Sequence, residues 1–192
     1  MTSFYIVRHG NTEFNQRGRI QGGQIDSPLT EQGYQDAIFL SKKLHGIKFE
    51  SVVSSDLGRT FITAHIIADN LGLSKRILRS KGLREIDFGD LTAKLREDAG
   101  YQKIKRDSSL RAPRGESYAD LQKRVIKILL DLSRRNYKNV LVVTHAGCIR
   151  CILSEALGKS LDSLLERKVS HRFIARLDIE GRRFRGFKII NE

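Results

Sequence analysis

The sequence has no tryptophan and only 7% aromatic residues, and this scarcity argues against one class of protein. Proteins that bind single-stranded nucleic acid combine a basic groove with aromatic side chains on which the bases stack. The chain is basic, with 35 Lys and Arg against 22 Asp and Glu and a formal net charge of +13, but its basic residues are scattered. The composition therefore predicts attraction to polyanions without specific recognition of nucleic acid.

Cysteine is also scarce, and this limits metal and redox chemistry. The two cysteines, Cys148 and Cys151, read with His145 as His-x-x-Cys-x-x-Cys, which could suggest zinc or redox activity. A structural zinc site usually needs four ligands, and no second cluster supplies the others. Asp87 and Asp90 share a segment but have no partner pattern for a metal. We expect both thiols to pack as small apolar side chains, and we expect no metal site.

Long apolar runs are absent as well. No run approaches the length of a membrane span, so we expect no membrane partner. The first ten residues do not follow the pattern of a secretory leader, which favours a cytoplasmic location. With 192 residues and 40% hydrophobic content, residues 1–192 are expected to form a single domain with a sizeable core.

Two apolar runs without alternation each end in a histidine. Residues 3–7 run into Arg8 and His9, and residues 139–144 run into His145. Such runs suit strands covered on both faces, and in open α/β sheets ligands gather beyond the carboxyl ends of the strands. If the two strands are neighbours, Arg8 and both imidazoles converge where they could hold and attack a phosphoryl group. One such histidine would more often be structural, but two together make phosphoryl transfer the leading hypothesis.

The rest of the chain alternates helical and strand patterns. Thr30 and Asp56 can each cap a helix, Gly72 can stop the second one, and the glycine-rich loop 16–23 should lie over the site. The expected helices are 30–45, 56–71, 118–135 and 147–157, and the further strands are 49–54, a short one near 76–78, 173–179 and 184–190. The last two strands predict an antiparallel hairpin. We expect an α/β fold, a three-layer α/β/α sandwich with a mainly parallel sheet and an antiparallel edge.

Six motifs in a fixed order carry a resemblance to a known family. They are Arg8-His9-Gly10 with Thr12 and Asn15, Leu29-Thr30-x-x-Gly33, Ser54-Ser55-Asp56-Leu57-x-Arg59-Thr60, Leu83-x-Glu85 with Phe88-Gly89, Gly115-Glu116-Ser117 and Thr144-His145-Ala146-Gly147. Each motif alone is weakly specific, but their order and spacing together are specific. On these residues the chain resembles, over nearly its whole length, the histidine phosphatase superfamily, also called the phosphoglycerate mutase-like family.

The resemblance implies that His9 is a nucleophile that is transiently phosphorylated on an unprotonated ring nitrogen. Nearby arginines should lower the pKa of this imidazole, and a hydrogen bond from its other nitrogen to the backbone would fix the tautomer. Glu85 is implied as the proton donor to the leaving oxygen and then as the base that activates water. The other implied site residues are Arg8, Arg59 and His145 around the phosphoryl oxygens, and Asn15, Gln21, Gly22 and Ala146 as substrate-binding residues. No cofactor is implied.

Outside its motifs, Glu85 would read equally well as a surface partner of an arginine. His45, His65 and His171 match none of the motifs, and we expect them to be structural or exposed.

Three functions stay open at this stage. Mutases of this family carry a long insertion that closes the site against water, whereas here the connection runs only from Glu85 to Gly115, which favours an open pocket and hydrolysis. The expected substrate is a small phosphorylated metabolite, of the α-ribazole phosphate or sugar phosphate type. The alternatives are a phosphoglycerate mutase and a non-catalytic polyanion-binding protein. The oligomeric state is open, with a homodimer as one option.

Overall fold

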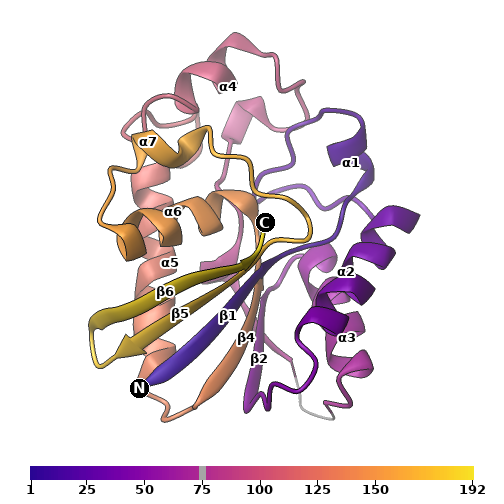
Figure 1. Cartoon of the computed structure of the whole chain (residues 1–192). Coiled ribbons are helices and arrows are strands. Elements are labelled where there is room, and N and C mark those ends of the chain that lie inside the picture. Colours follow the sequence, from indigo (N-terminus) through magenta and orange to yellow (C-terminus); the bar gives the residue numbers. More distant parts are fainter. Residues whose placement is uncertain (74–76) are drawn as a thin grey trace.

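The computed structural model describes residues 1–73 and 77–192 and shows a central sheet between helices (Figure 1). Within these residues the strands are β1 (Thr2–Arg8), β2 (Ser51–Ser55), β3 (Leu78–Ser80), β4 (Asn139–Thr144), β5 (Ile174–Glu180) and β6 (Arg183–Asn191). The helices are α1 (Glu13–Gln16), α2 (Glu31–Lys43), α3 (Gly58–Asn70), α4 (Ala99–Ile104), α5 (Tyr118–Ser133), α6 (Ala146–Leu157) and α7 (Asp162–Leu165). Of the short strand predicted near 76–78, residue 76 lies outside the described residues.

The sheet has the order β3-β2-β4-β1-β5-β6. The strands β3, β2, β4 and β1 pair in parallel, and β5 and β6 pair antiparallel to form the edge. The predicted fold class and the predicted terminal hairpin are therefore confirmed. Arg8 at the end of β1 is in register with Thr144 at the end of β4, so the two histidine-bearing ends are neighbours.

Alternate residues of the central strands pack on opposite faces of the sheet. Phe4 and Ile6 of β1 belong to the core under α5 and α6, whereas Tyr5 and Val7 belong to the core under α2 and α3. This burial on both faces explains why the strand sequences are continuously apolar. It also makes the sheet a rigid base, from whose carboxyl end the functional side chains project.

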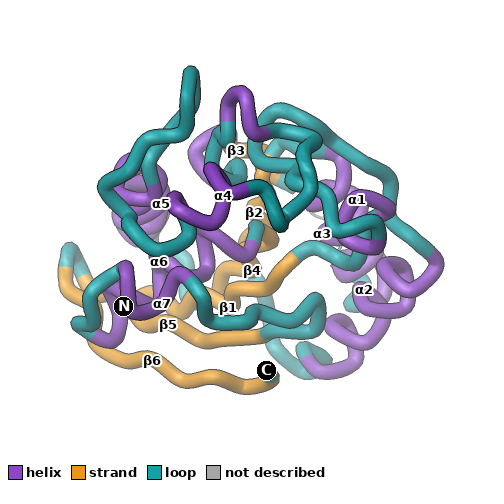
Figure 2. Tube along the Cα trace, turned by 90° about the horizontal axis from the view of Figure 1, so that it is seen from above, coloured by secondary structure: helices purple, strands orange, loops and turns teal. Residues whose placement is uncertain are grey.

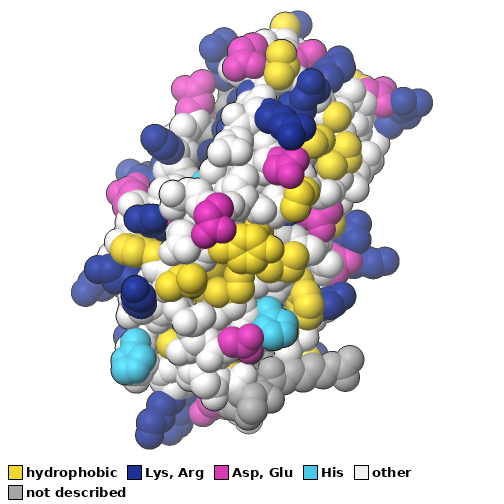
Figure 3. All heavy atoms as spheres, turned by 90° about the vertical axis from the view of Figure 1, so that its right-hand side faces the viewer, with side chains coloured by type: hydrophobic (Ala, Val, Ile, Leu, Met, Phe, Trp, Pro, Cys, Tyr) yellow, Lys and Arg dark blue, Asp and Glu magenta, His cyan; other side chains and the backbone are white. Residues whose placement is uncertain are grey.

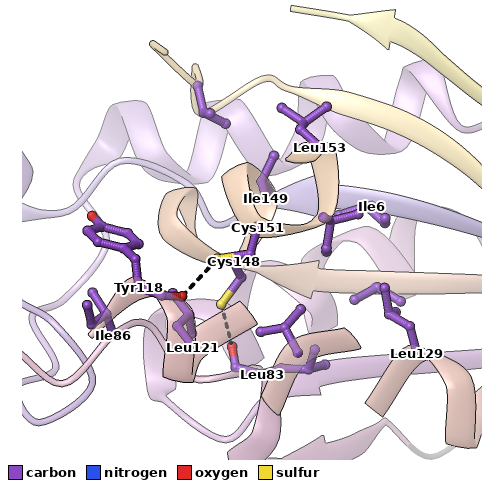
Figure 4. Packing of buried hydrophobic residues seen from close by; sticks show 14 of the residues in the cluster. Ile6, Leu83, Ile86, Tyr118, Leu121, Leu129, Cys148, Ile149, Cys151 and Leu153 are labelled. Atoms are coloured by element: carbon purple, nitrogen blue, oxygen red, sulfur yellow. Dashed lines mark hydrogen bonds between the residues drawn. The ribbon is translucent and has the colours of Figure 1, made fainter. Parts of the chain in front are cut away.

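The two cysteine thiols lie in the core between α6 and its neighbours (Figure 4). Cys148 and Cys151 are both free and buried. The thiol of Cys148 donates to the carbonyl oxygen of Arg84 at 3.1 Å, and burial raises the pKa of this thiol to about 12. A protonated, buried thiol is a poor nucleophile and a poor ligand, so these residues pack as the sequence predicted.

The prediction that Asp56 caps α3 is wrong. Asp56 lies one residue before the N-cap position, and its carboxylate instead pairs with Arg84 at 2.7 Å. The carboxylate of Asp26, from the loop before α2, accepts from the backbone N–H groups of Gly58 and Arg59. A side chain distant in sequence thus satisfies the orphan donors of this helix, which no local pattern reveals.

The amphipathic helix α5 begins with a complete capping box. The hydroxyl of Ser117 accepts from the backbone N–H of Asp120, whose carboxylate accepts from the backbone N–H of Ser117. Ser117, the serine of the Gly-Glu-Ser motif, therefore has a local structural role as the N-cap of α5. The short helices α1, α4 and α7 were not predicted, because one or two turns show no hydrophobic period.

The outer face of α2 and α3 is the part of the surface seen in Figure 3, where exposed hydrophobic side chains gather beside two histidines. Of the residues of these helices, Tyr34 of α2 and Ile62 and His65 of α3 are exposed, as is His45 just after α2. The exposure of the two histidines agrees with the sequence prediction. Among the described residues, no helix has the length and apolar character needed to traverse a lipid bilayer.

Candidate active site

The carboxyl ends of β1 and β4 bring His9 and His145 together. Their ring centroids are 5.1 Å apart in an edge-on arrangement, and the backbone N–H of His9 donates to the carbonyl oxygen of Thr144 at 3.0 Å. Loops and the short helices α1, α4 and α7 gather around this end of the sheet (Figure 2). The convergence expected from two apolar runs is therefore present.

His9 is held as a neutral imidazole with one free nitrogen. Its Nδ1–H donates to the carbonyl oxygen of Gly10 at 2.8 Å, which leaves the lone pair on Nε2. Burial, followed by the charge of Arg59, lowers the pKa of His9 well below its usual range. The sequence predicted the arginine effect and the backbone bond, but burial is the larger cause.

Arg59 fixes the tautomer of His145, which is the opposite of that of His9. Its Nη2 donates to Nδ1 of His145 at 3.3 Å, so the proton of that neutral imidazole resides on Nε2. Arg59 is only 2% exposed, and its guanidinium group is held by the carboxylate of Asp26 at 3.2 Å. Burial and the charge of Arg59 lower the pKa of His145 well below its usual range. His9 therefore presents an acceptor, whereas His145 presents a donor.

Three buried donors beside His9 have no hydrogen-bond partner among the described residues. They are Nε2 of His145, Nε of Arg59 and Nε of Arg8. Arg8 is anchored through Nη1 to the carbonyl oxygen of Val169 at 2.6 Å, and burial with repulsion from Arg150 lowers its pKa to about 9, so it is still a cation at neutral pH. Unpaired buried donors are costly, and an oxyanion would satisfy them.

The side chain of Glu85 reaches the N-terminus of α6. Its carboxylate accepts from the backbone N–H of Gly147 and from that of Ile86, each at 3.0 Å. A Cβ at position 147 would stand 2.1 Å from Oε1 of Glu85, so the approach requires glycine. The glycine of the Thr-His-Ala-Gly motif therefore exists to admit this carboxylate.

Two further motif glycines, Gly10 and Gly33, bring α2 against the end of β1. A Cβ on Gly10 would lie 2.2 Å from the carbonyl oxygen of Gly33, and a Cβ on Gly33 would lie 2.1 Å from that of Asn11. These contacts fix the backbone next to His9. The two glycines thus account for parts of the Arg-His-Gly and Leu-Thr-x-x-Gly motifs.

These side chains line a cavity of roughly 610 Å³. Of the residues implied from the sequence, the cavity is lined by Arg8, His9, Asn15, Gln21, Gly22, Arg59, Glu85 and Ala146. His145 is not part of this lining and contacts Arg59. Asn15 and Gln21 are linked through the hydroxyl of Thr12, at 3.0 and 2.6 Å. The loop 16–23 does border the site, as predicted, through Ile20, Gln21 and Gly22.

Sequence reasoning missed part of the cavity wall. His171 was expected to be structural or exposed; it is partly buried and lines the cavity, its ring centroid lies 5.6 Å from that of His9, and its Nδ1–H donates to the carbonyl oxygen of His9 at 2.8 Å. Burial lowers the pKa of His171 to about 3. Apart from the loop 16–23, the other lining residues missed are Asn11, Phe88, Arg96, Tyr101, Lys105, Tyr118, Arg150, Glu166, Lys168, Val169 and Ser170. Only Asn11 and Phe88 lie within a motif segment.

The connection between Glu85 and Gly115 contributes more than its length indicated. It was expected to leave less material for a lid than in the mutases, yet Arg96, Tyr101 and Lys105, in and beside α4, line the cavity. The aromatic rings of Phe88 and Tyr101 pack edge-on at 5.2 Å between centroids. The pocket therefore has a built wall on this side.

The comparison with protein families agrees with the geometry. Residues 4–191 match the family model of the histidine phosphatase superfamily (branch 1), and the chain belongs to this superfamily. The sequence-based identification and the enzyme class predicted with it are confirmed.

Relatives with different names share the fold. The chain is 36% identical over 190 residues to a protein named probable phosphoglycerate mutase GpmB from Enterobacter sp. (strain 638), covering 94% of this chain and 86% of that protein. It is 25% identical to the α-ribazole phosphatase of Shigella flexneri, with a TM-score of 0.85 and coverage of 100% and 96%. It is 27% identical to an Entamoeba histolytica phosphoserine phosphatase variant in complex with phosphoserine, with a TM-score of 0.81 and coverage of 97% and 96%.

Proposed function

We propose that this protein is a metal-independent phosphomonoester hydrolase that acts through a phosphohistidine on His9. The observation that carries the proposal is the lone pair on Nε2 of His9 beside three buried, unpartnered donors of Arg8, Arg59 and His145. A phosphoryl group satisfies both demands at once, because its oxygens accept from the donors while its phosphorus accepts the lone pair. The charge that a metal would supply comes here from two guanidinium groups.

In the first step, Nε2 of His9 attacks phosphorus and the bond from phosphorus to the leaving oxygen breaks. The carboxyl group of Glu85, positioned by the backbone N–H groups of Gly147 and Ile86, donates its proton to the leaving oxygen. The hydrogen bond from Nδ1–H of His9 to the carbonyl oxygen of Gly10 stabilises the positive charge that develops on the imidazole. The products are a free alcohol and phosphorylated His9.

In the second step, water attacks the phosphorus of phosphohistidine. The Glu85 carboxylate accepts a proton from this water, the nitrogen–phosphorus bond breaks, and the electron pair returns to Nε2 of His9. Arg8, Arg59 and His145 hold the same oxygens in both steps, since their positions are fixed by Val169, Asp26 and each other. Inorganic phosphate leaves and neutral His9 is restored.

The substrate proposed is a small phosphorylated metabolite, and the relatives named for α-ribazole phosphate and phosphoserine act on molecules of that size. Within this class, an α-ribazole phosphate or sugar phosphate is the sequence-based proposal. A cytoplasmic location is part of the same proposal, and a homodimer stays one option for the assembly. Specific nucleic-acid binding is not proposed.

A phosphoglycerate mutase is the second candidate, because the relative at 36% identity carries that name. A mutase must return the phosphoryl group from His9 to a bound acid instead of to water. The wall formed by Tyr101 and Lys105 gives this candidate more support than the short connection alone would. Interconversion of 2- and 3-phosphoglycerate, with no release of phosphate, would favour the mutase.

The test is release of inorganic phosphate from an aryl phosphate and a panel of small phosphomonoesters in the presence of EDTA. Wild type should turn over, and His9→Ala should not. His65→Ala is the matched control, because this exposed histidine pairs with Asp69 on α3, away from the cavity. Equal phosphate release by wild type and His9→Ala would refute the mechanism.

A further inference from the structure

The cavity is far more cationic than one phosphoryl group requires. Its lining holds seven arginine and lysine side chains but only two acidic ones, Glu85 and Glu166. Arg8 and Arg59 stand beside His9, and the further five cations are Arg19, Arg96, Lys105, Arg150 and Lys168. Of these five, Arg96, Lys105 and Arg150 are partly buried, whereas Arg19 and Lys168 are exposed.

The three partly buried cations, Arg96, Lys105 and Arg150, are not neutralised by acidic side chains. Within the described residues, none of Arg96, Lys105 and Arg150 forms an ion pair, although other arginines near the site, such as Arg59 and Arg84, each have an aspartate partner. Surface cations without a partner are common and need no explanation. Half-buried cations gathered in one cavity are unusual, because burial removes the water that would otherwise solvate them.

The same cations repel one another. Burial and the charge of Arg150 lower the pKa of Lys105 to about 7, and Arg96 acts in the same direction. Arg150 and Arg96 also lower the pKa of Arg8. The cluster formed by Arg96, Lys105 and Arg150 is therefore close enough to interact electrostatically with the proposed site of phosphoryl transfer. An anion bound among these groups would relieve repulsion that the folded protein otherwise maintains.

Contacts with the fold hold the side chains of Arg150 and Lys105 in place. Nε of Arg150, on α6, donates to the carbonyl oxygen of Arg167 at 2.8 Å. The ammonium group of Lys105, at the end of α4, donates to the carbonyl oxygen of Leu165 and lies 5.9 Å from the ring centroid of Tyr118. Anchoring of this kind lowers the entropy cost of binding, as in a site built for a ligand.

We propose that Arg96, Lys105 and Arg150 bind a second anionic group of the substrate, while Arg8, Arg59 and His145 bind the phosphoryl group that is transferred. The proposal rests on the proposed function and narrows its substrate class. Within the small phosphorylated metabolites, it replaces the sequence-based choice of substrate: preferred substrates are phosphomonoesters that also carry a carboxylate or a second phosphate. Phosphate esters of neutral sugars or nucleosides, α-ribazole phosphate among them, leave the cluster uncompensated and are poorer substrates.

The experiment compares pairs of substrates that differ in the second anion. Glycerol 3-phosphate and 3-phosphoglycerate differ in a carboxylate, and fructose 6-phosphate and fructose 1,6-bisphosphate differ in a phosphate. Within at least one pair, wild type should prefer the member with two anions by about 10- to 100-fold in kcat/KM, the size of a charged hydrogen-bond contribution. The pair that shows the preference identifies the anion.

Variants test whether Arg96, Lys105 and Arg150 cause the preference for the substrate with two anions. Lys105→Met and Arg150→Gln should reduce the ratio of kcat/KM within the preferred pair towards one. Lys103→Met is the matched control, because Lys103 is exposed on the same short helix and does not line the cavity, so its ratio should equal that of wild type. Equal kcat/KM within both pairs for wild type would overturn the proposal while leaving hydrolysis intact.

Binding separates this proposal from the proposed function. Calorimetric titration of His9→Ala protein with 3-phosphoglycerate, fructose 1,6-bisphosphate and their single-anion partners requires no turnover. Tighter binding of a two-anion member, weakened by Lys105→Met but not by Lys103→Met, supports the subsite even if hydrolysis fails. Equal affinities within both pairs, or an equal loss in both lysine variants, would contradict it.

Discussion

Gly147 lies so close to Glu85 that a single added carbon would stand 2.1 Å from the carboxylate oxygen Oε1. The backbone N–H of Gly147 donates to the other carboxylate oxygen at 3.0 Å. Glycine at this position therefore both admits and orients the proposed acid–base.

Gly147→Ala should displace Glu85 and lower kcat by about 10²-fold or more, within the range of general acid–base catalysis. The same substitution in a Glu85→Gln background should cost much less, because the group it displaces has already lost its function. Steady-state kinetics of the four proteins form a double-mutant cycle. Additive losses would mean that Gly147→Ala acts by another route, such as misfolding of α6.

Glu85→Gln should affect the two chemical steps unequally on an aryl phosphate. An aryl leaving group needs little protonation, so His9 is still phosphorylated, whereas water attack loses its base and slows by about 10²–10⁴-fold. Rapid mixing should therefore show a burst of phenolate equal to the protein concentration, followed by slow turnover. On an alkyl phosphate no burst of alcohol is expected, because an alkoxide leaving group needs the proton that Glu85 supplies. Unchanged steady-state rates would remove Glu85 from the mechanism.

Asp26→Ala should destabilise the protein more than Asp56→Ala. Asp26 caps α3 and pairs with the buried Arg59, whereas Asp56 pairs with the half-exposed Arg84. Loss of a cap costs about 0.5–2 kcal/mol and here also leaves the buried Arg59 without its ion-pair partner, whereas a partly exposed ion pair is worth about 1 kcal/mol. Chemical denaturation measures both, and Asp26→Ala should also raise KM because Arg59 loses its support. The reverse order of stabilities would contradict the observed cap.

Stability should fall as pH drops below 6.5. The pKa values of His9, His145 and His171 are all depressed by burial in the folded state, so the unfolded chain binds more protons at these positions. Their contribution is complete above pH 6.5 and is lost as pH falls, by up to about 4 kcal/mol per pH unit for three groups. Denaturation between pH 5 and 7 measures the slope, and His171→Asn should reduce it by about a third. A flat profile over this range would contradict neutral burial.

Much of the site follows from sequence because its main residues stand at the ends of two apolar strands. The runs before Arg8 and His145 predicted two buried strands whose histidines would converge if the strands were neighbours, and the register of Arg8 with Thr144 meets that condition. His171 could not be found in this way. It precedes β5, and it reaches His9 only because β5 pairs antiparallel with β1, with Val7 opposite Ile174. Nothing in the local sequence specifies that pairing.

The other omissions have the same physical origin. Arg96 and Lys105 flank α4, a helix of six residues, and such a short helix shows no period by which its buried face could be predicted. Asp26 caps α3 across a gap of more than thirty residues in the sequence, whereas the expected cap, Asp56, is adjacent. Local patterns predict strands and long helices, but contacts between loops depend on the assembled fold.

Trapping the phosphorylated enzyme tests the central claim most directly. Protein in excess is mixed with an isotope-labelled phosphomonoester, quenched in alkaline denaturant, digested and mapped by mass spectrometry. The mechanism predicts an acid-labile, base-stable phosphoryl group on the peptide that contains His9, absent from His9→Ala and longer-lived in Glu85→Gln. Turnover without any label on His9, or a label on another residue that persists in His9→Ala, would contradict a phosphohistidine mechanism.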